Sequence, residues 1–171
     1  MEKAALEKIS YGLYVLGVPG GQGGWGGCIV DAVMQVTSDE PAVLALASMK
    51  KNQTNLSLKE SKDFTLSVLS KQVDPFVVAN FGFQSSREVD KWANVPYEMM
   101  DGVPALAEYC ARLRCTVKEF QEFSTHTLFL CTVLDAATGK GEPLLYEDYR
   151  RDFKNEVFAA FQVFKKQSRN A

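Results

Sequence analysis

The chain has 171 residues, of which 46% are hydrophobic and 11% aromatic, which is enough for one domain with its own core. Lysine and arginine total 19 against 21 acidic residues, and a net charge of −2 offers no field that would attract nucleic acid or an anionic membrane. The charged start MEKAALEK is unlike a signal peptide, and no run reaches the roughly 18 apolar residues that a membrane span requires. We therefore expect a cytoplasmic protein with neither nucleic acid nor membrane as a partner.

The first part of the chain predicts strands separated by loops. Residues 9–18, 28–37 and 42–49 are rich in branched and aromatic side chains, as strands are. The segment VPGGQGGWGG between the first two contains six glycines, which indicates a loop. A short turn that ends at Pro41 precedes the third strand, and such a short link favours a hairpin.

Gly21, Gly23 and Gly26 match the G-x-G-x-x-G pattern of dinucleotide-binding turns. In such a turn a helix begins inside the motif, so that its N-terminus meets the pyrophosphate. Here Gly27 extends the glycine run, and residues 28–37 are better suited to a strand than to a helix. A dinucleotide-binding turn is therefore the weaker interpretation.

Short helices are expected in the middle of the chain, each with a polar residue that can cap its first turn. The candidate caps are Asn52 or Thr54 for a helix ending near Ser61, Asp74 for a helix through Phe81, and Ser85 or Ser86 for a helix over residues 87–93. Pro75 suits the second helix because proline at the first helical position loses no hydrogen bond. A strand over residues 63–70 separates the first two helices.

Apolar and polar side chains alternate from residue 106 to 120, which predicts a long half-buried strand. Residues 126–136 continue the sheet after a turn, and the glycines of Thr138–Gly141 end it. Strands dominate and the helices are short, which together favour an antiparallel barrel with peripheral helices.

The last residues, 151–171, differ from the rest. Phe153, Val157, Phe161 and Phe164 recur at helical spacing, which predicts an amphipathic helix. We expect this helix to pack on the barrel domain of residues 1–150 or on a partner subunit.

The four cysteines, Cys28, Cys110, Cys115 and Cys131, form no C-x-x-C pair, and the chain has a single histidine. A structural metal site from near neighbours is therefore not expected. Cys110 and Cys115 are an odd number of residues apart, so on one strand they would point to opposite faces and could not form a disulfide. Buried, reduced thiols are the simplest interpretation.

Two polar clusters follow apolar segments. Residues 50–54, KKNQT, come after a strand and at the start of a helix, where N–H groups, a hydroxyl and ammonium groups could converge on a phosphate. The second cluster comprises Ser85, Ser86, Arg87 and Lys91, and lies next to Phe81 and Phe83. The two clusters could grip one phosphate while the aromatic rings cover a planar ligand. The alternative for the first cluster is a solvated loop. The alternative for the second cluster is a helix cap with a surface ion pair, and the residues alone favour this alternative.

The only histidine, His126, stands at the start of a predicted strand. No second histidine and no G-x-S-x-G motif are present to complete a catalytic triad, so serine hydrolase chemistry has little support. A lone histidine at a strand edge is more often a hydrogen-bonded or exposed residue than a catalyst.

Four parts of the sequence carry a wider similarity: YGLYVLGV, DAVMQVTSDEPAVLALASMKKNQTN, ANFGFQSSREVDKW, and THTLFLCTVLDA with PLLYEDYR. In order and spacing they resemble the flavin reductase family with the FMN-binding split-barrel fold, over about residues 9–149. The similarity is greatest to flavoredoxins and to the reductase portion of rubredoxin-containing electron-transfer proteins. The resemblance implies a mainly β fold, with an FMN-binding split β-barrel over residues 1–150, short helices and a C-terminal helix.

The resemblance also implies site residues. The isoalloxazine would be lined, largely through backbone groups, by Asp31, Ala32, Val33, Met34 and Gln35. The FMN phosphate would be held by Ser48, Met49, Lys50, Lys51 and Thr54, and on the other side by Phe81, Gly82, Phe83, Ser85, Ser86, Arg87 and Lys91. His126 aligns with the histidine of the family's Gly-Asp-His motif, which reads Ser124-Thr125-His126 here, and would orient the nicotinamide.

The activity implied by the resemblance is hydride transfer from NADH or NADPH to flavin N5 in a homodimer. Electrons would pass to free flavin or to a separate rubredoxin or flavodiiron-type protein, because the C-x-x-C pairs of a rubredoxin module are absent. One alternative is a non-enzymatic FMN electron carrier that another protein reduces. A more distant alternative is a β-barrel interaction module without a cofactor, and a hydrolase has the least support.

Overall fold

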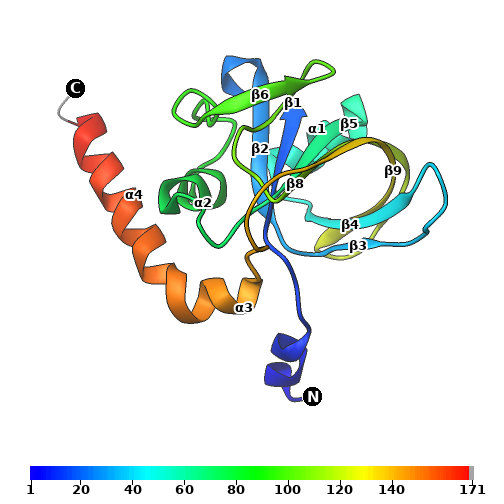
Figure 1. The fold of residues 1–171 in the computed structure, drawn as a ribbon, viewed down its shortest axis with the longest axis horizontal. Coiled ribbons are helices and arrows are strands. Elements are labelled where there is room, and N and C mark those ends of the chain that lie inside the picture. The colour runs from blue at the N-terminus through cyan, green and yellow to red at the C-terminus, as the bar shows by residue number, and fades with distance from the viewer. Residues whose placement is uncertain (170–171) are drawn as a thin grey trace.

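The computed structural model describes residues 1–169, and within them a curled antiparallel sheet of seven strands is the main element. Its strands lie in the order β2-β1-β5-β8-β9-β4-β3, and Figure 1 shows them curving into a half-barrel. The strands are β1 (Tyr14–Pro19), β2 (Trp25–Val30), β3 (Val33–Gln35), β4 (Val43–Met49), β5 (Asp63–Val68), β8 (Ala111–Glu122) and β9 (His126–Thr138). The expected fold class, mainly β with peripheral helices, is confirmed.

A first apolar core fills the barrel. It includes Leu16 of β1, Phe64 of β5 and Phe129 of β9, each no more than 1% exposed. In each strand every second residue contributes to this core, because successive residues of a strand point to opposite faces. Leu58 of helix α1 (Gln53–Ser61) belongs to the same core, so α1 is held against the barrel.

The glycine-rich segment is the turn of the β1–β2 hairpin. A three-residue 3-10 turn, η2 (Gln22–Gly24), leads directly into β2, so no helix begins at the glycine motif and the dinucleotide-binding interpretation is wrong. Gly27 lies inside β2, where an added Cβ would be 2.3 Å from the carbonyl oxygen of Leu16. That position therefore requires glycine.

The predicted strand over residues 28–37 is interrupted. β2 ends at Val30 and pairs with β1, whereas β3 begins at Val33 and pairs with β4 at the other end of the sheet order. Asp31 and Ala32 make the connection between the two edges. Hydrophobicity alone does not reveal this break, because both halves of the segment have the composition of a strand.

The predicted strand over residues 106–120 is also divided. β8 begins only at Ala111, and residues before it form a separate hairpin of β6 (Tyr97–Met100) and β7 (Val103–Leu106). Asp101 and Gly102 form its turn with φ values of 44° and 77°. Asp-Gly is a typical pair for such a turn, so the sequence did contain a signal for this hairpin.

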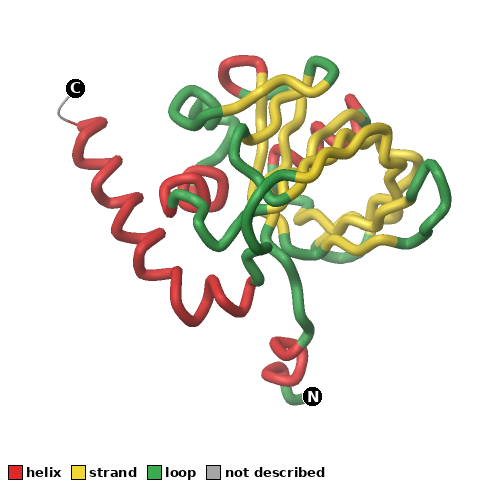
Figure 2. The backbone as a smooth tube through the Cα atoms, viewed as in Figure 1, coloured by secondary structure: helices red, strands yellow, loops and turns green. Residues whose placement is uncertain are grey.

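Figure 2 shows the helices in red around the sheet, and η1 (Lys3–Lys8) at the N-terminus stands apart from it with no buried residue. The helices are η1, α1, α2 (Pro75–Phe83), α3 (Tyr146–Asp148), the π-helical turn η3 (Tyr149–Phe153) and α4 (Lys154–Arg169). The predicted start of α2 is confirmed, since Asp74 Oδ1 accepts a hydrogen bond from the N–H of Phe76 at 2.8 Å. None of the helices within residues 1–169 is long and apolar enough to cross a membrane.

The prediction of a helix over residues 87–93 is wrong, because this segment forms turns. Lys91 and Trp92 point inward and donate hydrogen bonds from their side chains to the backbone carbonyls of Gly27 and Gly26 in β2. A regular helix would not direct two adjacent side chains into the same strand, so these tertiary bonds override the capping signal at Ser85 and Ser86.

A second apolar core lies between the sheet, α2 and α4. It includes Val77 and Val78 of α2 together with Val157 and Phe161 of α4. The last helix therefore packs on the body of the same chain, and Figure 1 shows it standing beside α2.

Candidate functional site

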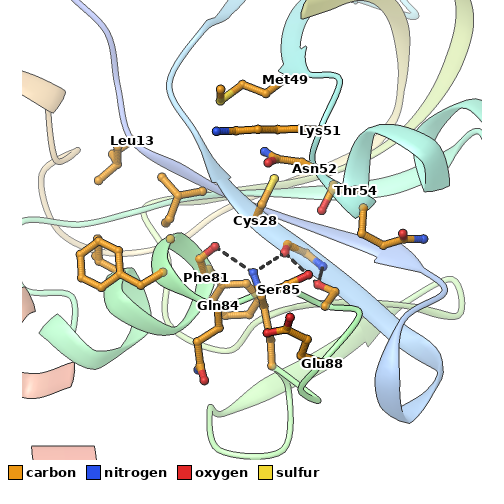
Figure 3. Close-up of a pocket in the computed structure, with 18 of the residues that line it drawn as sticks. Leu13, Cys28, Met49, Lys51, Asn52, Thr54, Phe81, Gln84, Ser85 and Glu88 are labelled. Carbon is orange, nitrogen blue, oxygen red and sulfur yellow. Dashed lines mark hydrogen bonds between the residues drawn. The ribbon is translucent and has the colours of Figure 1, made fainter. Parts of the chain in front are cut away.

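A cleft of about 600 Å³ opens between β2, α1, the end of α2 and the α3–η3 segment. Figure 3 shows its lining, with residues after β4 along one side and residues at the end of α2 along another. The lining residues are Leu13, Gly27, Cys28, Ile29, Met49, Lys51, Asn52, Gln53, Thr54, Val78, Phe81, Gly82, Phe83, Gln84, Ser85, Ser86, Glu88, Lys91, Tyr146 and Tyr149. Parts of both predicted polar clusters thus meet in one cleft.

The α1 side of the cleft presents polar groups. β4 ends at Met49, the chain turns with a hydrogen bond from the N–H of Asn52 to the Met49 carbonyl (3.1 Å), and α1 begins at Gln53. Asn52 is the N-cap residue, but its side chain makes no capping bond. The first-turn N–H groups of α1 are therefore not occupied by a cap, and Lys51 and Thr54 lie beside them in the cleft.

The opposite side uses its polar atoms internally. Ser86 Oγ donates to the carbonyl of Gly27 and accepts from the N–H of Gly27, both at 3.1 Å. Lys91 Nζ donates to the carbonyls of Gly27 and Phe81, both at 3.0 Å, and the lysine is only 2% exposed. These two residues join the end of α2 to β2, and so they fix the shape of this wall.

The buried Lys91 and Cys28 have shifted pKa values. Burial lowers the pKa of Lys91 to about 8 from its usual 10.5, although the nearby Cys28 opposes the shift. Burial raises the pKa of the Cys28 thiol, and the hydrogen bond from Thr54 and the charge of Lys91 only partly offset this. Cys28 is therefore a protonated thiol at neutral pH and is unsuited to be a nucleophile.

One side chain from each cluster connects the two. Arg87 Nε donates to Gln53 Oε1 at 2.8 Å, which links the 85–91 segment to the first turn of α1. Arg87 itself is exposed and does not line the cleft. Lys50 is directed elsewhere, since its Nζ lies 2.6 Å from a carboxylate oxygen of Glu122 on β8.

The remaining predicted flavin-binding residues lie outside the cleft lining. Five of them occupy the edge of the sheet around β3, namely Asp31, Ala32, Val33, Met34 and Gln35. Met34 is 63% exposed. Ser48 is 1% exposed, and its Oγ has no hydrogen-bond partner within residues 1–169. Ser48 alternates along β4 with Met49, which lines the cleft, so Ser48 lies on the face of the strand that carries Leu44 and Leu46 of the barrel core.

His126 stands beside the cleft. It is the cross-strand neighbour of Met49, which lines the cleft, and it is half-buried at the start of β9. Its Nδ1 lies 2.8 Å from Thr125 Oγ1, so the threonine hydroxyl helps to hold the ring. Across residues 1–169 no cluster of three or more cysteine, histidine or carboxylate side chains is arranged to bind a metal ion.

Two tyrosines of the cleft were not predicted from the residues. Tyr146 and Tyr149 stack with ring centroids 5.9 Å apart and planes inclined by 24°. Burial raises the pKa of Tyr149, and the neighbouring Tyr146 raises it to a smaller extent. Their spacing of three residues is the helical signal that could have placed them on one face.

Comparison with known proteins identifies the family. Residues 6–155 match the pattern of the flavin reductase like domain. The chain belongs to this family. The family resemblance and the fold expected from the sequence are thereby confirmed.

Two curated relatives in the family extend the comparison. The ferric-chelate reductase (NAD(P)H) of Archaeoglobus fulgidus is 36% identical over 152 residues, which cover 87% of this chain and 89% of that protein. The high molecular weight rubredoxin of Moorella thermoacetica is 34% identical over 154 residues and 88% of this chain. The match spans only 66% of the Moorella protein, or just under two thirds of its length.

Solved structures show the same fold. Flavin reductase PheA2 superposes with a TM-score of 0.71 at 25% identity, covering 84% of this chain and 89% of that one. The NADH:FAD oxidoreductase SgcE6 of Streptomyces globisporus, solved with NAD and FAD fragments, has a TM-score of 0.71 at 23% identity and covers 84% and 87% of the two chains. The split-barrel fold is therefore shared with flavin reductases.

Proposed function

We propose that this protein is an NAD(P)H-dependent flavin reductase that holds FMN in the cleft. The main support is the α1 end of the cleft, where Lys51 and the uncapped first turn of the helix offer a cation and N–H groups. This set of donors suits a phosphate. Phe81, Phe83, Tyr146 and Tyr149 also line the cleft and offer aromatic surface to a planar ring system.

The protein's own residues would divide the binding between them. Lys51 and the first turn of α1 would hold the phosphate. The role of Ser48 stays a prediction from the resemblance. Phe81 and Phe83 would form an apolar wall against the ring. The roles assigned to the backbone of residues 31–35 and to Arg87 stay predictions from the resemblance.

Bound FMN would supply a hydride acceptor at N5 and pass electrons on singly or in pairs. The chain would contribute placement of the nicotinamide, which accelerates transfer by orientation without an acid or a base. His126 is our candidate for this placement, because it lies next to Met49 at the cleft and is itself held by Thr125.

The partners are also part of the proposal. The name of the Moorella relative supports a rubredoxin as electron acceptor, and a flavodiiron-type protein or free flavin would serve equally. We infer a homodimer, for which the exposed apolar side chains Met34, Val36 and Leu134 provide surface. Cytoplasmic location stays a prediction from composition.

A non-enzymatic FMN electron carrier is the second candidate. It is supported by Ser124 and Thr125, which stand where the family's motif has glycine and aspartate. Such a carrier would bind FMN tightly but would receive its electrons from another protein.

The deciding experiment is an anaerobic titration. Purified protein is titrated with FMN while flavin fluorescence and the visible spectrum are followed, and NADH or NADPH is then added. Tight binding with rapid bleaching of the yellow colour is the result we expect. Binding without bleaching would favour the carrier, and no binding of flavin would overturn the proposal.

His126 can be tested in the same assay. We expect His126→Ala to lower kcat/KM for the nicotinamide about 10-fold or more, because a misplaced donor loses orientation, while the Kd for FMN stays unchanged. Ser124→Ala is the matched control, since it alters the same turn without touching the ring. An unchanged kcat/KM in His126→Ala would leave His126 with a structural role only.

A further inference from the structure

The C-terminal helical segment runs without a break from Tyr146 to Arg169 through α3, η3 and α4. The family match ends at residue 155, so nearly all of α4 lies beyond it. α4 is therefore a feature that the family resemblance does not explain.

α4 contacts a residue of the cleft wall. Phe83, the last residue of α2, lines the cleft, and its ring stacks on Phe158 of α4 with centroids 4.9 Å apart and planes inclined by 24°. Phe161 of α4 meets the same ring edge-on, with centroids 5.4 Å apart. Two aromatic rings of α4 thus restrict the orientation of Phe83.

α4 is anchored along the whole of α2. Phe164 packs on Phe76 near the start of α2 with ring centroids 4.7 Å apart. Val157 is fully buried and Phe161 is 9% exposed in the core that α2 shares. This anchoring gives Phe158 a fixed position from which to hold Phe83.

The same helical segment also forms part of the cleft directly, because Tyr146 and Tyr149 line it. The segment includes a π-helical turn over Tyr149–Phe153, and π turns occur often at functional sites. One continuous segment therefore supplies two residues to the cleft and supports a third from behind.

We propose that Phe158 is a positioning residue for the flavin site, acting through Phe83. This inference rests on the proposed function. Phe83 is 38% exposed even with α4 in place, so without the Phe158 ring it would gain rotamers that binding must then restrict. Phe158 is 44% exposed, so its removal changes the support of Phe83 without opening a cavity in the core.

The test measures FMN affinity by fluorescence titration. Immobilising a side chain on binding costs roughly 0.5 to 1.5 kcal/mol, so we expect Phe158→Ala, which leaves Phe83 to be restricted by the ligand, to raise the Kd for FMN about 2- to 10-fold. Val163→Ala is the matched control, because Val163 is on the same helix and 55% exposed, and it should leave the Kd unchanged. Phe158→Tyr keeps the ring and should restore wild-type affinity.

A double-mutant cycle distinguishes positioning from a general effect on folding. If Phe158 acts through Phe83, then Phe158→Ala adds no further loss of FMN affinity in a Phe83→Ala background, and the melting temperatures of Phe158→Ala and Val163→Ala stay close. If the losses of FMN affinity in the two single variants add up in the double variant, or if the Kd of Phe158→Ala is unchanged, this inference is overturned while the proposed function still stands. A wild-type protein that binds no FMN would overturn the proposed function and this inference with it.

Discussion

Two polar segments of similar composition meet at the cleft and behave differently. Residues 51–54 lie at the start of α1 and present an ammonium group and first-turn N–H groups that no side chain caps. In residues 85–91, Ser86 and Lys91 donate to carbonyls of β2 and α2 instead. The first segment therefore leaves a cation free for a ligand, whereas the cation of the second segment, Lys91, is used within the protein.

The difference shows that the destination of each polar atom, and not the presence of serine and lysine, distinguishes a binding surface from a structural brace. A buried polar group must be paired, and a pair within the protein leaves less for a ligand. We therefore expect changes in residues 85–91 to affect stability first, and changes in residues 51–54 to affect binding first.

Replacing Lys91 has the largest expected effect. Lys91→Met removes the donor for the carbonyls of Gly27 and Phe81 in a buried position, and we expect a loss of about 2 to 3 kcal/mol in the free energy of unfolding. Denaturant unfolding followed by circular dichroism measures this loss. If Lys91→Met were as stable as the wild type, the brace interpretation would fail.

The pH dependence of that loss follows from the lowered pKa of Lys91, about 8 in the folded protein against 10.5 normally. Between these values the unfolded chain binds more protons than the folded one, so the stability contributed by Lys91 rises with pH. The stability gap between wild type and Lys91→Met should therefore widen from pH 8 towards pH 10. Lys118→Met removes a lysine from an exposed position on β8 and is the control.

Ser86→Ala should destabilise the protein by about 1 kcal/mol, because both hydrogen bonds between Ser86 Oγ and the backbone of Gly27 are lost. Ser85→Ala is the matched control, since Ser85 Oγ accepts only the exposed bond from the N–H of Arg87. Thermal unfolding of the two variants side by side measures the difference. Equal losses would show that burial of the Ser86 bonds is not what matters.

Lys51→Gln should act on binding and not on stability. Loss of the cation beside α1 should weaken FMN about 5-fold, close to 1 kcal/mol, and riboflavin, which lacks the phosphate, should bind as before. The effect should shrink as salt is added. An equal loss for riboflavin would place the phosphate elsewhere in the cleft.

Arg87→Ala should have the smallest effect. Its bond to Gln53 is exposed, so we expect stability to change by less than about 0.5 kcal/mol. A loss of FMN affinity beyond 5-fold would instead assign Arg87 to the ligand, and would weaken the contrast between the two segments.

Much of the fold was predictable from the sequence. Alternating side chains indicated β9 and most of β8, and Asp74 with Pro75 marked the start of α2, because these signals are local. The break between β2 and β3 was not predictable in the same way, since it depends on which strands the two halves pair with.

The site was predictable to a smaller extent. Residues 51–54 lie in the cleft, and a strand end followed by a helix start is visible there in the sequence. Residues 81–83, 85 and 86 also line it, and the family resemblance pointed to them. That Lys50 pairs with Glu122 and that Lys91 turns into the protein depend on distant parts of the chain. Tyr146 and Tyr149 reach the cleft because the chain after the last strand pairs with residues 11 and 12 near the other end of the sequence.

The position of these two tyrosines in the chain has a consequence for biosynthesis. Tyr146 and Tyr149 come after all the strands of the described sheet, so a ribosome completes the barrel strands before it adds the last wall of the cleft. Segments synthesised earlier can begin to fold while later ones are still being made. The binding surface of the cleft is therefore complete only when the segment after the last strand has been made.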